Sequence, residues 1–184
     1  MRIITGSARG TRLKSPVGVG TRPTADRTRE ALFSMLGTRV YDAQVLDLFA
    51  GTGALGLEAL SRGAERAVLV DRTTHAVMEE NIRRTKMENR AVIRRGDVYG
   101  QLAALSQEGH TFDLIFADPP YESGDNTRVL CAVEEGRILA AEGLLILEQG
   151  AEEPLIDHAG SFSLLRERRY GAARLCFYTE EVQG

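Results

Sequence analysis

The sequence predicts an α/β fold in which helices cover both faces of a mainly parallel sheet. From Gln44 onward, short apolar runs alternate with amphipathic stretches of helical length, which is the pattern of a doubly wound sheet. A glycine-rich turn follows the first apolar run, and an acid ends the second. The chain closes with two strand-like runs around Gly171-Ala172-Ala173, which indicate an antiparallel hairpin at one sheet edge.

The N-terminal part of the chain has a different pattern. Arg2–Thr5 and Thr11–Lys14 predict a small β-hairpin, because Ser7, Arg9 and Gly10 lie between the two runs. A glycine-rich linker follows this hairpin up to Thr21. We therefore expect a basic hairpin and linker over residues 1–21, and one larger domain over residues 22–184.

The larger domain is expected to begin with a helix and to contain seven strands. Thr24 can cap a helix from Ala25 to Leu36, whose apolar residues share one side. The expected strands are Val45–Phe49, Ala67–Val70, Ala91–Arg94, Leu114–Ala117, Leu144–Leu147, Ser161–Tyr170 and Arg174–Thr179. The expected helices between the first five strands lie near Ala54–Arg62, Thr74–Glu88, Val98–Ser106 and Thr127–Ala140.

Composition excludes several classes of protein. With 184 residues, 43% of them hydrophobic, the chain can form a stable core without further support. Cys131 and Cys176 are far apart and have no histidine at metal-binding spacing, so neither a disulfide framework nor a metal site is predicted. We expect no signal peptide, because the first residues contain no apolar core of the required length, and no membrane-spanning helix, because no apolar run is long enough. We expect a cytoplasmic protein that acts as a monomer.

Positive charge is concentrated at the N-terminus. Residues 1–40 contain eight basic and two acidic residues, a net charge of +6, whereas the rest of the chain carries −9. A basic arm on an acidic body can bring one face to a phosphate backbone. An ordinary solvated surface is the alternative. The candidate RNA contacts are Arg2, Arg9, Arg12, Arg22, Arg27 and Arg29.

A cofactor loop is predicted after the first core strand. Asp47 to Gly56 contains a GxGxxG pattern that opens a helix, and the next strand ends at Asp71, twenty positions beyond Gly51. A glycine turn allows close approach of the backbone to a ligand, and an acid at the second strand end can accept hydrogen bonds from a ribose. The pattern therefore indicates a cofactor that contains adenosine, and its candidate contacts include Phe49 and Gly53.

Charge favours S-adenosylmethionine over a nicotinamide dinucleotide. A dinucleotide brings a pyrophosphate to the helix start, whereas S-adenosylmethionine brings an ammonium and a sulfonium, beside which acids are favourable. Asp47 is placed to bind the cationic end, and Asp97, after the third strand, can accept from the adenine amino group. As alternatives, Asp47 organises the turn and Asp97 caps the following helix.

Asp118-Pro119-Pro120-Tyr121 directly follows the apolar run Leu114–Ala117. The prolines form a stiff corner that ends the strand. Asp118 and the Pro119 carbonyl can accept hydrogen bonds from a planar amino group, and Tyr121 offers a face on which a ring can stack. Taken alone, these four residues also fit an ordinary turn. Because Asp71, Asp97 and Asp118 all follow strands, they are expected at one rim, which favours methylation of an exocyclic amine.

These motifs resemble those of class I S-adenosylmethionine-dependent methyltransferases, which have a Rossmann-like fold. The segments Arg22–Phe33 (RPTADRTREALF) and Leu48–Gly63 (LFAGTGALGLEALSRG), together with DPPY at Asp118–Tyr121, are similar to the RsmD family of bacterial 16S ribosomal RNA guanine-N2 methyltransferases. The resemblance covers nearly the whole chain.

The resemblance implies a guanine of 16S rRNA in the small ribosomal subunit, or in an assembly intermediate, as the target. It implies cofactor contacts at Asp47, Gly51, Gly53, Asp71 and Asp97, target-base contacts at Asp118 to Tyr121, and a position for Thr24 near the cofactor or target.

Three other functions stay open. The same chemistry can act on adenine N6 or on another RNA or DNA base. A nicotinamide oxidoreductase could use the same loop, although no hydride-transfer residues are evident. A non-catalytic RNA-binding module could use the basic arm alone.

Overall fold

The structure is a computed structural model that describes residues 1–16, 23–120 and 125–181, without the side chains of residues 23–25. Arg22, Tyr121 and the predicted linker after Pro16 lie outside the described residues. The helices are α1 (Pro23–Leu36), α2 (Ala54–Ser61), α3 (His75–Thr85), α4 (Val98–Gln107) and α5 (Asp125–Gly136), with the 3-10 turn η1 (Gly37–Val40). The strands are β1 (Gln44–Leu48), β2 (Arg66–Asp71), β3 (Ala91–Arg95), β4 (Phe112–Ala117), β5 (Leu139–Gly150), β6 (His158–Ala159), β7 (Phe162–Tyr170) and β8 (Ala173–Glu180).

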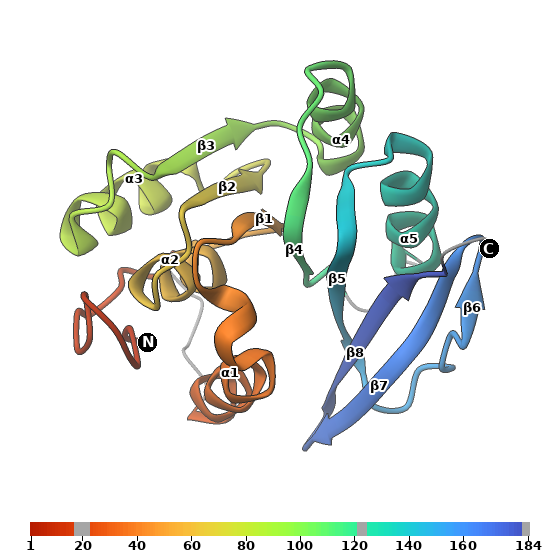
Figure 1. Ribbon diagram of the computed structural model, residues 1–184. Helices are drawn as coiled ribbons and strands as arrows, with labels where there is room; N and C mark the ends of the chain where they lie inside the picture. Colours follow the sequence, from red (N-terminus) through yellow and green to blue (C-terminus); the bar gives the residue numbers. More distant parts are fainter. Residues whose placement is uncertain (17–22, 121–124, 182–184) are drawn as a thin grey trace.

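The strands form one sheet in the order β3-β2-β1-β4-β5-β8-β7-β6 (Figure 1). The first five strands pair in parallel, and β8, β7 and β6 are antiparallel to their neighbours. The strand order reverses between β1 and β4, which is where doubly wound sheets bind ligands. The seven predicted strands are present, and the two-residue β6 extends the edge to eight.

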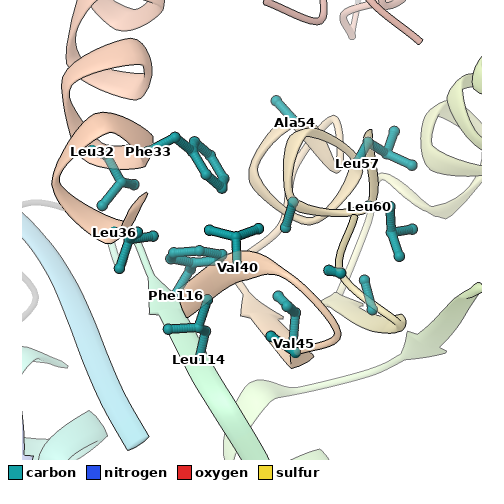
Figure 2. Packing of buried hydrophobic residues seen from close by; sticks show 14 of the residues in the cluster. Leu32, Phe33, Leu36, Val40, Val45, Ala54, Leu57, Leu60, Leu114 and Phe116 are labelled. Atoms are coloured by element: carbon teal, nitrogen blue, oxygen red, sulfur yellow. The ribbon is translucent and has the colours of Figure 1, made fainter. Parts of the chain in front are cut away.

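Each face of the sheet carries its own apolar core. Helices α1, α2 and α3 cover one face, and α4 and α5 cover the other (Figure 1). On the first face, the ring centroids of Phe33 in α1 and Phe116 in β4 are 5.7 Å apart in an edge-to-face arrangement, and Leu32 and Leu36 lie beside them (Figure 2). Burial of these large side chains fixes α1 over the sheet.

Gly56 allows α2 to pack closely on the sheet. A Cβ atom at this position would lie 2.2 Å from Leu69 Cδ2 in β2, and 3.4 Å from Asp47 Oδ2 in β1. A larger residue would require the buried Leu69 side chain or the helix to shift. The third glycine of the GxGxxG pattern therefore serves helix packing, as expected of that position.

The N-terminal arm (residues 1–16) is held by side chains of the domain. The fully buried carboxylate of Glu58 in α2 accepts hydrogen bonds from Ile4 N at 2.8 Å and Thr5 N at 3.1 Å. Its charge is paired with Arg62 Nε at 2.8 Å and Arg29 Nε at 3.7 Å. Because a buried carboxylate is costly without such partners, the arm backbone and Glu58 depend on each other.

Asn81 in α3 joins the arm to the loop between β1 and α2. Its Oδ1 accepts from Lys14 N at 2.7 Å, and its Nδ2 donates to Lys14 O and to Thr52 O, both at 2.9 Å. The side chain is fully buried. The last residues of the arm and the glycine-rich loop are thus fixed by one amide group.

Three local expectations differ from the structure. The predicted helix over Thr127–Ala140 ends at Gly136, because Leu139 already pairs with Phe112 as the first residue of β5. Helix α1 begins at Pro23 rather than after a Thr24 cap, which agrees with the preference of proline for a first helical turn. The N-terminal hairpin has antiparallel backbone hydrogen bonds, but its only ladder pairing in the described residues is the bridge between Arg2 and Arg12.

Candidate functional site

The loop from β1 to α2 makes a sharp turn at the carboxyl end of the sheet. Phe49, Gly51 and Gly53 have φ angles of 58°, 55° and 77°, a region that glycine adopts at little cost and that strains a phenylalanine. The strained Phe49 lies directly after the strand that begins this turn. Strain of this kind is often found at ligand sites.

Asp47 is buried inside this turn. Its Oδ2 accepts a hydrogen bond from Gly56 N at 2.9 Å, and its side chain is 2% exposed. Burial raises the pKa of Asp47 to about 7, and the charge of Asp71 adds to this, whereas the Gly56 hydrogen bond opposes it. Asp47 therefore organises the turn, the alternative considered above, and also places a carboxyl group beside a cavity.

Asp71 holds the loop from the end of β2. Its Oδ2 accepts from Gly51 N at 3.0 Å, and its Oδ1 accepts from Thr73 N at 2.8 Å and Thr74 N at 3.0 Å. Burial alone would raise the pKa of Asp71, but these amide hydrogen bonds outweigh it, and the pKa is lowered. Asp71 thus remains an anion that can accept further hydrogen bonds.

Asp97 begins α4 and accepts from Gly100 N at 3.1 Å, so it is a helix cap. The first turn of α4 contains Tyr99, whose hydroxyl donates to Asp125 Oδ1 at 2.9 Å. The guanidinium of Arg128 in α5 lies 3.6 Å from the centre of the Tyr99 ring. Asp97 caps the helix and lines a cavity, so both predicted roles are compatible with its position.

Two cavities meet at Asp118, at the carboxyl ends of the parallel strands. The larger cavity, of about 660 Å³, includes Asp71, Asp97, Tyr99 and Arg128 in its lining. The smaller cavity, of about 390 Å³, has a wall of Asp47, Gly51, Thr52 and Glu148. Asp118 and Phe49 line both cavities, while Pro119 and Pro120 line the larger one. A single elongated ligand can therefore extend from one cavity into the other past Asp118.

Asp118 is in a strongly negative environment. Asp118 is exposed on the cavity side, but the protein atoms around it partly desolvate its carboxyl group, and this desolvation together with the charges of Glu148 and Asp47 raises its pKa to about 8. Three carboxyl groups in one wall repel one another unless they take up protons or a cation binds beside them. The wall is therefore suited to a ligand that carries positive charge.

Most of the predicted site residues meet at this rim. Asp47, Phe49, Gly51, Asp71, Asp97, Asp118, Pro119 and Pro120 line one or both cavities. Gly53 contributes to the turn that begins α2. Tyr121 lies outside the described residues, as does the side chain of Thr24.

The predicted RNA contacts divide into two groups. Arg2, Arg9, Arg12 and Arg27 are exposed, and Arg22 lies outside the described residues. Arg29 is different, because its side chain is 4% exposed and its guanidinium is bound to Asp26 Oδ1, Arg2 O and the Glu58 carboxylate. The structure thus corrects the expectation for Arg29: it joins α1 to the arm and is not an exposed surface contact.

Several residues of the site were missed from the sequence, among them Tyr99 and Arg128 of the larger cavity, Glu148 and Asn81. Glu148 directly follows the apolar run Leu144–Leu147, so its place at a strand end was a signal that the sequence did contain. Asn81 gave no such signal, because its role depends on three backbone groups that only folding brings together. Among the residues described, no group of three or more metal-ligating side chains is found. No described helix is long and apolar enough to cross a membrane.

Comparison with known proteins places this arrangement in a family. The family model described as Conserved hypothetical protein 95 matches residues 1–179. The chain is 38% identical over 186 residues to Ribosomal RNA small subunit methyltransferase D of Escherichia coli K12, covering 100% of this chain and 92% of that protein. It is 31% identical to the Haemophilus influenzae protein of the same name, covering 97% and 93% of the two chains.

Comparison with a solved structure shows that the fold is also similar. The Escherichia coli protein yhhF has a TM-score of 0.86 and 38% identity, with 100% of this chain and 99% of that chain covered. The similarity extends over the arm, the glycine loop and the Asp118 corner together. The chain therefore belongs to the family described as Conserved hypothetical protein 95, the RsmD family of 16S rRNA methyltransferases that its motifs resemble.

Proposed function

We propose that this chain transfers a methyl group from S-adenosylmethionine to the exocyclic N2 of a guanine in 16S rRNA of the small ribosomal subunit. The chain is a S-adenosylmethionine-dependent rRNA methyltransferase. The position of Asp118 where the two cavities meet supports transfer to an exocyclic amine, and membership of the RsmD family supports a guanine N2 of 16S rRNA as the target. We place the reaction in the cytoplasm and assign it to a monomer.

The chemistry of the cavities fits the cofactor. The amides and carboxylates at Asp71 and Asp97 suit the adenosine half, and the wall of Asp47, Asp118 and Glu148 suits its ammonium and sulfonium. When bound, S-adenosylmethionine supplies a methyl group activated by the positive sulfur. The Tyr99 ring, held by its hydrogen bond to Asp125, gives the larger cavity a firm aromatic wall.

Asp118 and Pro119 position the amine in this proposal. A guanine amino group is a weak nucleophile because its lone pair is delocalised into the ring. The Asp118 carboxylate and the Pro119 carbonyl can accept hydrogen bonds from its two N–H groups. These hydrogen bonds orient the lone pair of the nitrogen toward the methyl group. Asp118 is ionised while a cationic cofactor lies beside it; once the methyl group is transferred that positive charge is gone, and the raised pKa of Asp118 then allows the carboxylate to take up the proton that the nitrogen loses. The base must be accessible or flipped out of its stack.

The exposed arginines of the arm and of α1 support RNA binding. Arg2, Arg9, Arg12 and Arg27 are exposed, and the arm is fixed to the domain through Glu58 and Asn81. Methyl transfer to small subunits isolated from cells that lack this gene tests the proposal. Incorporation of labelled methyl into 16S rRNA is the expected result, and its absence from any RNA would favour a non-catalytic binding module.

Cofactor affinity should depend on pH. Burial and mutual repulsion raise the pKa of Asp47 to about 7 and that of Asp118 to about 8. A cationic ligand favours the ionised carboxylates and lowers both pKa values, so protons are released when it binds. We therefore expect the affinity for S-adenosylmethionine to rise from pH about 6 to about 8 and to level off above that.

Calorimetry in buffers of different ionisation enthalpy measures this proton release directly. S-adenosylhomocysteine lacks the positive charge on sulfur, so its affinity should change less over the same range. A dissociation constant for S-adenosylmethionine that stays constant across this range, with no proton released, would refute the assigned role of the carboxyl wall.

A further inference from the structure

Strand β7 carries a row of exposed cationic side chains on one face of the sheet edge. Arg166, Arg168 and Tyr170 alternate along the strand, and both arginines are exposed. Side chains two residues apart on a strand point to the same side. Arg166 pairs with Phe177, and Arg168 pairs with Leu175, across the β7–β8 ladder.

These pairings show which face the row lies on. Leu175 and Phe177 are buried in the core beneath α1, whereas Cys176 and Tyr178 are buried on the α5 side. Directly paired residues of adjacent strands share a face. Arg166, Arg168 and Tyr170 therefore lie on the α1 face. Figure 1 shows β7 on the far side of β8 from α1, and this helix leaves both arginines uncovered.

The row is level with the proposed catalytic corner. Leu175 pairs with Glu148 in β5, and Glu148 and Leu175 both line the smaller cavity with Asp118. Strands in a sheet lie about 4.8 Å apart, so Arg168 is about 10 Å from Glu148 across β8. Tyr170 lies two residues farther along β7, at the turn that joins it to β8.

The two arginines have no acidic partner within the described residues. Arg168 Nη1 donates to the backbone oxygen of Glu167, and no ion pair involving Arg166 or Arg168 occurs in the described parts of the chain. The neighbour on the other face, Arg169, is paired with Glu152 Oε1 at 3.5 Å and donates to Ala151 O at 2.6 Å. The arginines on one face of β7 are thus without an acidic partner in the described residues, whereas Arg169 on the other face is paired.

We propose that Arg166 and Arg168, with Tyr170 beside them, form a second RNA-binding surface, separate from the N-terminal arm. The inference rests on the proposed function, because the RNA that delivers a base to Asp118 must pass beside this rim. Two guanidinium groups at alternate positions on a strand can bind successive phosphates, and the aromatic ring offers a stacking surface. The RNA would then be held on both sides of the smaller cavity.

Charge reversal of single arginines tests the surface. Arg168→Glu and Arg166→Glu should each weaken binding to a 16S rRNA transcript and to small subunits several-fold at about 0.1 M salt. Each should lower the slope of log affinity against log salt by about 0.7–0.9, the value for one lost phosphate contact. The control is Arg169→Glu, the same change on the next residue of the strand but on the other face, which should leave affinity and slope close to those of wild type.

Three further measurements keep the result interpretable. S-adenosylmethionine affinity should stay unchanged in all three variants, and the melting temperature should stay unchanged in Arg166→Glu and Arg168→Glu. Arg166→Lys and Arg168→Lys should retain the wild-type salt slope. Equal effects of Arg168→Glu and Arg169→Glu, or none from either arginine of the row, would overturn the proposal. The RNA-binding measurement does not depend on methyl transfer. Failure of the proposed reaction would instead appear as wild-type protein that binds RNA but does not methylate it, so the two outcomes can be distinguished.

Discussion

Replacing Asp118 by alanine lowers the rate of methyl transfer by about 10²–10⁴-fold, the range for loss of a group that orients a reactant or transfers its proton. Asp118 is expected to fix the amine where the two cavities meet. S-adenosylmethionine binding should weaken far less than the rate of transfer, because Asp47 and Glu148 of the carboxyl wall remain, as do Asp71 and Asp97. Single-turnover methylation of small subunits, with cofactor affinity measured separately, gives both quantities.

Two further variants sharpen this prediction. Asp118→Asn keeps an acceptor oxygen but cannot take up a proton near neutral pH, so a smaller loss than in Asp118→Ala would identify positioning as the main role. Asp113→Asn changes the acid at the opposite end of β4, whose Oδ2 accepts from Gln44 N at 2.8 Å, and should retain activity. Wild-type rates in Asp118→Ala would exclude Asp118 from the reaction.

Replacing Glu58 by alanine should lower the free energy of unfolding by about 3–5 kcal/mol, the cost of removing one partner from a buried ionic network. The change leaves the amides of Ile4 and Thr5 without their acceptor and leaves Arg29, which is 4% exposed, without an anion on that side. Urea denaturation measures the stability. Because the arm loses this attachment, RNA binding should also weaken.

Glu80 in α3 provides the matched control. Like Glu58, it is paired with two arginines, Arg83 and Arg84, but all three residues lie at the surface. Exposed ion pairs contribute little to stability, so Glu80→Ala should have a far smaller effect on unfolding. Comparable changes in the two variants would show that the buried network does not anchor the arm.

The sheet and most of the rim could be predicted because they depend on local pattern. The alternation of apolar runs located the strands, and the position of Asp47, Asp71, Asp97 and Asp118 after or near strand ends placed them at one rim. The glycine pattern located the turn before α2 because few other residues adopt its backbone angles. The predicted C-terminal end of α5 was wrong, because the pairing of Leu139 with Phe112 in the sheet overrides the helical pattern of the sequence.

The remaining features depend on contacts between distant parts of the sequence. Glu58 meets Ile4 across 54 positions, and Asn81 meets Lys14 across 67 positions, so no local pattern identifies them. Arg29 was placed among the surface arginines because charge alone does not show that a helix face is buried. The face on which Arg166 and Arg168 lie also follows only from strand register.

The most direct test of the proposed function is the position of the methyl group in the product. Small subunits from cells lacking this gene are methylated with purified protein, and the 16S rRNA is digested and analysed by mass spectrometry. The proposed function predicts one modified guanine that carries the methyl group on N2, present with the wild-type protein and absent or strongly reduced with Asp118→Ala. A methyl group on adenine N6 or on another position, or equal modification by the variant, would contradict it.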